Sequence, residues 1–301
     1  MANQFLAHYP FTSEAKNFVA EQKIDLNYDL LEISKARVIS ALKDGQIPSM
    51  DTQVEEALKL EICSYAVSRM LVSLLKSKFY VSRYSIAEAK RASSYLKVDS
   101  DENLAKVTRE FNIGWNKGSM QVSDYLAYAP RALEYKLINK HLSNGLVSLT
   151  RNEFIRVIEE AIRKHIESSL PINEQAIPSQ VQALVAEVKK ALPQETAKIT
   201  IQPQKGEYAP CIKKLLEDLK NSENLPHIAR WSLAVYLIHK GVDVDSIVNL
   251  FKTAPDFNEK VTRYQVEYVK KRGYKMPNCS VIMSYGLCVA RCRIKNPLEF
   301  K

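Results

Sequence analysis

The chain has 301 residues, of which 46% are hydrophobic and 26% charged, and its formal net charge is +9. This length allows two domains, and the composition is ordinary for a soluble, helix-rich globular protein. No apolar run approaches the roughly 20 residues of a membrane-spanning helix, and the start MANQFLAHYPFTSEAK lacks the pattern of a signal peptide. These features exclude the class of helical membrane proteins.

Helical periodicity dominates the first 192 residues. Helices are expected to begin near Thr12 and near Asp29, the second one ending before Asp44-Gly45. A long helix that follows Asp51 has apolar residues on more than one face, which indicates burial on several sides. A further helix is predicted over Ile86–Lys97, with basic residues on one side. Together these elements predict a mainly α N-terminal domain.

Two local signals predict a small α/β element inside this domain. Asn144-Gly145 predicts a turn into a short strand over Leu146–Leu149. Thr150 and Glu153 have the spacing of a capping box at the start of a helix. The apolar stripe of that helix is formed by Phe154, Ile155, Ile158, Ile162 and Ile166. Pro178 is expected to start one more amphipathic helix.

The run PQETAKITIQPQKG, residues 193–206, has two prolines and no helical period. It therefore predicts a linker between an N-terminal domain, residues 1–192, and an all-α C-terminal domain, residues 207–301. In the second domain, helices are expected over His227–Lys240 and over Glu259–Lys271, the latter ended by Gly273. Asp243 is predicted to cap a short helix and not to bind a metal.

Positive charge is concentrated near the C-terminal end. From Glu207 to Lys301, 16 Lys and Arg residues stand against 10 Asp and Glu residues. Between Val261 and Lys295, eight basic residues are accompanied by a single acid, Glu267. Such focusing indicates a polyanionic partner. The alternative is a basic face that serves only solvation.

Four of the five cysteines are candidates for one metal centre. Cys279, Cys288 and Cys292 lie within fourteen residues of each other, and Cys211 stands far upstream. Four thiolates can hold either a zinc ion or an iron–sulfur cluster. The absence of a C-x-x-C pair favours iron, as do the basic residues around Cys292, but zinc stays open at this point.

The fifth cysteine, Cys63, lies in an apolar run and is expected to be a small buried hydrophobe, not a ligand. An odd number of unevenly spaced cysteines does not predict a disulfide scaffold. A reducing, cytoplasmic setting fits this cysteine usage better.

Two groups of side chains could bind nucleotides or nucleic acid. His227 and Arg230 lie three residues apart at a predicted helix start, where a phosphate would be favoured. The alternative for His227 is a structural histidine bonded to the backbone. The second group combines aromatic and basic residues that can stack on bases and bind phosphates, namely Arg263, Tyr264, Gln265, Tyr268, Lys270, Lys271, Arg272 and Tyr274.

Several runs carry a resemblance to a known family. ENLPHIARWSLAVYLIHKG (Glu223–Gly241), PDFNEKVTRYQVEYV (Pro255–Val269) and the order of one upstream cysteine and three clustered ones resemble the C-terminal domain of archaeal and eukaryotic DNA primase large subunits. SRYSIAEAKRASSYL (Ser82–Leu96) and NGLVSLTRNEFIRVIEEAIRKHI (Asn144–Ile166) are similar in layout to the archaeal members. The resemblance covers nearly the whole chain.

The resemblance implies a non-catalytic, regulatory subunit in RNA primer synthesis for DNA replication. It implies one [4Fe–4S] cluster on Cys211, Cys279, Cys288 and Cys292. The expected partners are the small catalytic subunit, template DNA, the RNA or DNA primer and nucleoside triphosphates, with replicative polymerase or helicase components as further candidates. The N-terminal domain is expected to bind the small subunit, and the protein is expected in the cytoplasm, associated with the nucleoid.

The resemblance also assigns roles to single residues. His227 and Arg230 are similar in position to family residues that contact the triphosphate end of the primer or the initiating nucleotide. Tyr264 and Gln265 match a Tyr-Asn pair near template and primer. The chain departs from the eukaryotic pattern at Pro226, where another Arg occurs, and in its shorter loops between the last three cysteines.

Two other classes remain open from the sequence. An iron–sulfur nuclease can also combine one distant cysteine with a close trio, but it requires an acidic metal site with a nearby Lys. A zinc-stabilised module in a nucleic-acid assembly is the second alternative. Metal content separates the zinc module from a cluster protein, and metal-dependent cleavage by the chain alone would indicate the nuclease.

Overall fold

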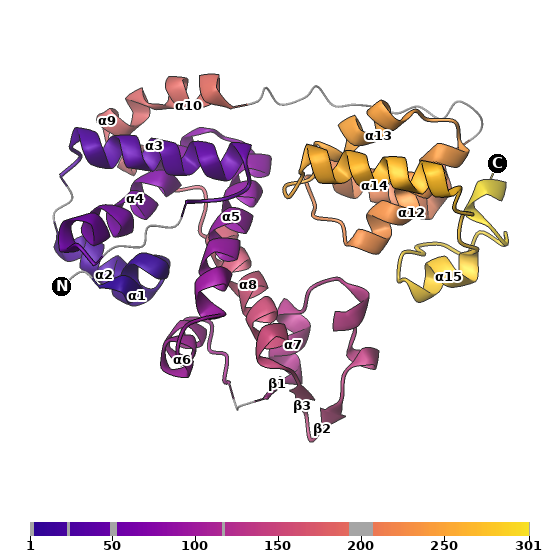
Figure 1. The fold of residues 1–301 in the computed structure, drawn as a ribbon, viewed down its shortest axis with the longest axis horizontal. Coiled ribbons are helices and arrows are strands. Elements are labelled where there is room, and N and C mark those ends of the chain that lie inside the picture. Colours follow the sequence, from indigo (N-terminus) through magenta and orange to yellow (C-terminus); the bar gives the residue numbers. More distant parts are fainter. Residues whose placement is uncertain (1–2, 23–24, 49–52, 116–117, 193–206, 301) are drawn as a thin grey trace. The chain divides into compact units, whose positions relative to one another are not determined.

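The structure is a computed structural model that describes all residues except 1–2, 23–24, 49–52, 116–117, 193–206 and 301 (Figure 1). The chain divides into two compact units. The first contains Met1–Pro130 and Tyr135–Pro193, and the second contains Gln194–Lys301 with the short segment Arg131–Glu134. The predicted linker, residues 193–206, lies outside the described residues. No described helix is long and apolar enough to cross a membrane.

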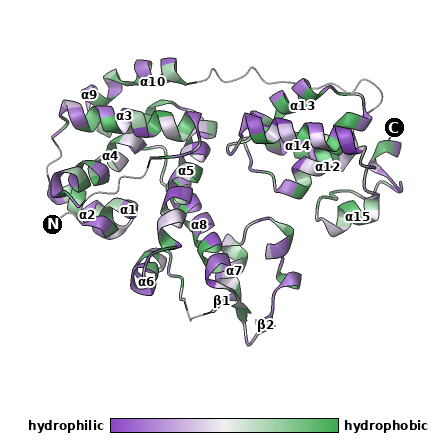
Figure 2. Cartoon of the chain, viewed as in Figure 1, coloured by the Kyte–Doolittle hydropathy of each residue, from purple (hydrophilic) through white to green (hydrophobic). Residues whose placement is uncertain are grey.

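The first unit is mainly helical, as predicted. Its α-helices are α1 (Gln4–His8), α2 (Ser13–Glu21), α3 (Tyr28–Lys43), α4 (Glu55–Leu74), α5 (Lys78–Leu96), α6 (Asp101–Arg109), α7 (Val122–Tyr128), α8 (Arg151–Ser168), α9 (Ser179–Ala183) and α10 (Val185–Ala191). Short 3₁₀ turns are formed by Leu137–Asn139 and Glu174–Ala176, and another, Leu133–Tyr135, begins in the short segment that belongs to the second unit. The helices carry a hydrophobic and a hydrophilic side, as expected around a core (Figure 2).

A small antiparallel sheet in this unit has the strand order β1 (Ser119–Gln121), β3 (Leu146–Ser148), β2 (Leu142–Ser143). Asn144 and Gly145 connect β2 to β3 and both have positive φ, 49° and 76°. Two-residue hairpins need this backbone twist, and Asn-Gly adopts it most easily. The predicted turn and strand are therefore confirmed.

The core of the first unit surrounds α4, α5 and α8, and α8 runs beside α5 (Figure 1). All five members of the predicted α8 stripe are buried. Thr150 and Glu153 form the predicted capping box. Cys63 is buried in the same core, and burial raises the pKa of its thiol.

Two predictions for this unit were wrong in extent. The helix expected over Ile86–Lys97 begins eight residues earlier, at Lys78. Among the basic residues of the predicted range, Lys90 and Lys97 are exposed. Arg83 donates to the backbone carbonyls of Leu42 and Lys43, and Arg91 is buried. The helix expected after Pro178 is interrupted at Leu184, which separates α9 from α10.

The second unit is helical in its described residues. It consists of α11 (Pro210–Lys220), α12 (His227–His239), α13 (Val244–Phe251), α14 (Glu259–Arg272), α15 (Cys279–Ser284) and a 3₁₀ turn, Pro297–Glu299. Asp243 caps α13 by accepting from the Ser246 backbone N–H at 2.8 Å. Gly273 ends α14 with φ +60°, where a side chain would be strained. These features agree with the sequence predictions.

The core of the second unit is built around α12, whose residues Ser232–Leu237 are all buried. α13 and α14 pack against it, and α14 contributes Val266 and Val269. One face of α14 thus holds the helix in the unit, and its other positions are partly or fully exposed.

Candidate metal centre and nucleic-acid interface

The four predicted ligand cysteines all belong to the second unit. Cys211 is the second residue of α11, after Pro210, and it is buried. Cys279 is the first residue of α15, and its backbone N–H donates to the Lys295 carbonyl at 2.8 Å. That bond joins the start of α15 to the C-terminal segment, which carries Cys288 and Cys292.

The four thiols lie close enough to influence each other. Burial is the main cause that raises the pKa of Cys211 to about 11; the Ile212 backbone N–H opposes it, and the nearby Cys288, Cys279 and Cys292 raise the pKa further. Burial and the other two clustered thiols also raise the pKa of Cys279. Cys211 and the three clustered cysteines therefore lie in the same part of the second unit, and all four are free thiols.

The four thiols differ in their surroundings. Cys211 belongs to the apolar core of the unit and Cys288 packs against that core. The Sγ atoms of Cys288 and Cys292 lie 3.3 and 3.6 Å from the Ala290 carbonyl oxygen. No three His, Cys, Asp or Glu side chains of the described residues converge closely enough for a single metal ion. The metal assignment stays a prediction.

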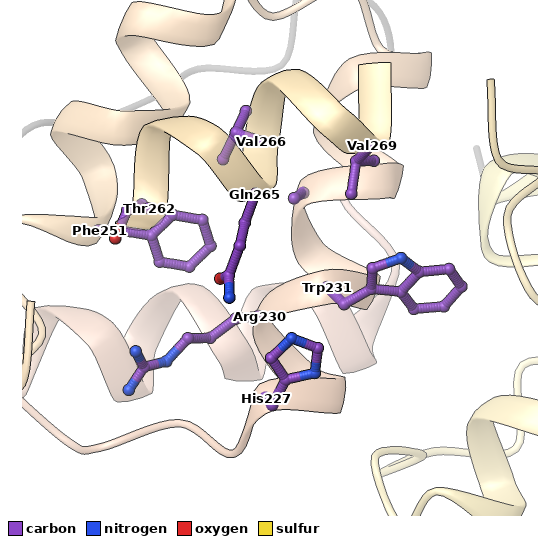
Figure 3. A pocket seen from close by; sticks show the side chains of 9 residues that line it. His227, Arg230, Trp231, Phe251, Thr262, Gln265, Val266 and Val269 are labelled. Carbon is purple, nitrogen blue, oxygen red and sulfur yellow. The ribbon is translucent and has the colours of Figure 1, made fainter. Parts of the chain in front are cut away.

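A small cavity between α12 and α14 gathers several of the predicted binding residues (Figure 3). Its volume is about 40 Å³, which admits water but not a nucleotide. It is lined by His227, Arg230, Trp231, Ala234, Phe251, Thr262, Gln265, Val266 and Val269. A ligand would therefore bind at the rim of this cavity. The fold brings His227, Arg230 and Gln265, which come from two helices, to one place.

His227 and Arg230 occupy the first turn of α12, as predicted. His227 is exposed. Arg230 is half-buried and already paired: its Nη2 lies 2.5 Å from Asp256 Oδ1 and also bonds the side chain of Asn224. Its Nε donates to the Leu225 carbonyl at 2.9 Å. These partners could not be predicted from the sequence, because they lie in the connections before α12 and before α14.

Aromatic rings form a continuous row along α14 and beyond it. Tyr264 and Tyr268 stack with ring centroids 6.2 Å apart, Tyr268 is 6.4 Å from Tyr274, and Tyr274 is 5.6 Å from Trp231. Tyr264 is 68% exposed, and Tyr268 and Tyr274 are each 38% exposed. All three tyrosine rings are therefore exposed at the surface of the second unit. Trp231 lines the cavity and contacts this row of rings. The sequence pattern did not indicate it, although it follows Arg230 directly.

The basic residues of α14 differ in whether they already contact another side chain. Arg272 lies over the Tyr268 ring, 5.1 Å from its centroid, and donates to the Tyr268 hydroxyl at 3.0 Å. Lys270 and Lys271 are exposed. Arg263 is paired with Asp245 at 2.6 Å, so its charge is partly neutralised. Lys270, Lys271 and Arg272 lie in the last turn of α14, where the negative end of the helix dipole favours cations even without a ligand.

Comparison with known proteins agrees with this geometry. Residues 201–300 match the family model of the C-terminal domain of the eukaryotic and archaeal DNA primase large subunit. The DNA primase large subunit PriL of Methanocella arvoryzae is 32% identical, covering 98% of this chain and 87% of the relative. The protein of the same name from Methanosarcina mazei is 32% identical, covering 100% and 88%. The one from Halobacterium salinarum is 29% identical, covering 94% and 87%.

Similarity at this level extends through both units, and the matched C-terminal domain contains the cysteines, the cavity and the tyrosine row. The chain therefore belongs to the DNA primase large subunit family.

Proposed function

We propose that this chain is the non-catalytic large subunit of a primase, which supports a small catalytic subunit in RNA primer synthesis. The observation that carries this proposal is the cavity that joins His227, Arg230 and Gln265 within the family-matched unit. On this proposal the first unit binds the small subunit. The second unit binds template, primer and the initiating nucleotide.

The first turn of α12 is proposed to bind the triphosphate end of the primer or the initiating nucleotide. A helix start presents free backbone N–H groups and the positive end of the helix dipole. His227 is exposed there, and Arg230 supplies a guanidinium that suits phosphate oxygens. A phosphate at the rim of the cavity would meet all three.

The exposed tyrosine row is proposed to contact template and primer. Base–aromatic stacking contributes about 1–3 kcal/mol per base and tolerates any sequence. Tyr264 offers the most exposed ring, and Gln265 beside it lines the cavity. Lys270 and Lys271 are placed to bind the backbone phosphates, and each such contact would steepen the salt dependence of binding by about one unit.

Cys211, Cys279, Cys288 and Cys292 are proposed to hold one [4Fe–4S] cluster. A single zinc ion, with Zn–S bonds of about 2.3 Å, needs its four sulfurs in close contact, whereas each ligand of a cluster binds a different iron. The thiols affect each other's pKa values, and this supports one shared site for all four. When bound, the cluster would join α11 to the C-terminal segment.

The anion site can be tested by comparing two primer ends. His227→Ala with Arg230→Ala should weaken binding to a triphosphate-ended primer–template duplex about tenfold, and should affect the hydroxyl-ended duplex much less. Fluorescence anisotropy at fixed salt measures both affinities. Lys220→Ala, which removes one exposed positive charge from α11, is the matched control and should change both affinities equally. Equal losses in the double variant would remove the assignment.

A further inference from the structure

We propose that the carboxylate of Asp256 competes with the phosphate of the ligand for Arg230. The anion site, formed by His227 and Arg230, would therefore bind its ligand less tightly than it would without this carboxylate. This inference rests on the proposed triphosphate site. It concerns a residue in the connection between α13 and α14, outside the helix that carries Arg230.

The contacts of Arg230 are anionic and polar. Nη2 lies 2.5 Å from Asp256 Oδ1. The Nε donor is used by the Leu225 carbonyl at 2.9 Å, and Asn224 takes a further bond from Nη2. Asp256 therefore occupies the kind of position on the guanidinium that a phosphate oxygen would take.

The side chain of Arg230 also does not point toward the other predicted binding residues of the cavity. Figure 3 shows the guanidinium of Arg230 directed away from the His227 ring and from the Gln265 amide. A phosphate bound near His227 would have to draw Arg230 away from Asp256, or would have to bind next to a carboxylate. Both routes lower the affinity, the first by breaking an ion pair and the second by repulsion between like charges.

The ion pair has the right environment for such a competition. The side chains of Arg230 and Asp256 are 23% and 22% exposed, so the pair is neither fully screened by solvent nor locked in the interior. A buried pair would cost too much to open. A fully exposed one would weaken binding very little.

The competition acts only on ligands that reach Arg230. A triphosphate end carries several negative charges and competes with the Asp256 carboxylate for the Arg230 guanidinium. A hydroxyl end makes no demand on the guanidinium and should not sense Asp256. The two ends thus provide a built-in comparison within one protein.

The chain also offers a matched control. Arg263 and Asp245 form a second Arg–Asp pair in the same unit, at 2.6 Å. Neither residue lines the cavity. Asp245→Asn and Asp256→Asn make the same change in net charge, and each removes the aspartate carboxylate from one arginine. Arg263 keeps Glu259 at 3.8 Å. Only Asp256→Asn acts on Arg230, which lies on the same helix turn as His227.

The test uses the full chain and the two duplexes described above. Asp256→Asn should tighten binding of the triphosphate-ended duplex about fivefold and leave the hydroxyl-ended duplex within twofold of the wild type. Asp245→Asn should change both affinities by the same factor. Asp256→Glu, which keeps the charge, should behave as the wild type, and it checks the interpretation if the Asn variant folds poorly.

The outcomes separate this inference from the function on which it rests. If the wild-type protein binds both ends equally, the anion site itself is wrong. If the wild type prefers the triphosphate but Asp256→Asn brings no gain, the competition is overturned and the anion site stands. Weaker triphosphate binding by Asp256→Asn would show that Asp256 positions Arg230, which also overturns the competition.

Discussion

At the scale of single residues, Glu153 combines two stabilising roles. Its carboxylate completes the capping box of α8 by accepting from the Thr150 backbone N–H at 2.8 Å, and it bonds the Lys140 ammonium. The bond with Lys140 is the main cause that lowers the pKa of Glu153 to about 2, and the bonds from Thr150 act in the same direction. The ionised form is therefore the one that the folded protein prefers.

The lowered pKa gives the stability a defined dependence on pH. The contribution of Glu153 should be complete above its ordinary pKa of 4.5 and should be lost as the pH falls toward 2, because protonation then removes both sets of bonds. Glu153→Gln should cost about 1 kcal/mol at pH 7. Its deficit in thermal unfolding should shrink between pH 4.5 and pH 2, whereas a constant deficit would contradict the assignment.

At the scale of elements, a buried network of four charges joins three helices of the first unit. Arg37 of α3 bonds Glu61 of α4 and Glu88 of α5, at 2.5 and 2.7 Å. Arg91 of α5 bonds Glu61 at 2.6 Å, so Glu61 serves both arginines. All four side chains are at most 6% exposed. The two positive and two negative charges neutralise each other in a place where the side chains are too buried to be solvated by water.

Loss of Glu61 should therefore destabilise the first unit strongly. Glu61→Gln leaves two buried guanidinium groups with one carboxylate, which should cost about 3–5 kcal/mol in chemical denaturation. Glu56→Gln is the control on the same helix, because Glu56 pairs with Lys59 at the surface and is 79% exposed. Its effect should stay below about 0.5 kcal/mol. A cost of similar size for both variants would contradict this role of the network.

At the scale of the whole molecule, the two units should depend differently on metal. The second unit has a core of its own, to which Cys211 and the other buried apolar residues of α11 belong. A cluster would link residues that are far apart in the sequence, so cluster binding is expected to be coupled to folding of this unit. The first unit contains no proposed ligand.

Substitution of single cysteines tests this difference. Cys211→Ser should lose most of its iron and the absorbance near ~400 nm of the cluster. It should also lose the thermal transition of the second unit, while the first unit unfolds as before. Cys63→Ser, in the core of the first unit, is the control and should keep its iron. Full iron content in Cys211→Ser would contradict the ligand assignment.

Local signals in the sequence predicted much of this protein. The capping box at Thr150, the Asn144-Gly145 hairpin, the stripe of α8 and the end of α14 at Gly273 are each determined by residues within a few positions of one another. Such short-range interactions are readable because helix and turn geometry fixes which neighbours meet. The cysteine spacing and the basic α14 also gave the candidate site.

Only the tertiary structure decided how the charged side chains are used. The sequence predicted basic residues on one side of α5, but Arg91 lies in a buried network with residues from two other helices. Arg230 and Arg263 were predicted as ligands for phosphate, yet each meets an aspartate from another segment. An ion pair between residues far apart in the chain leaves no periodic trace, because it depends on how helices pack and not on local backbone geometry.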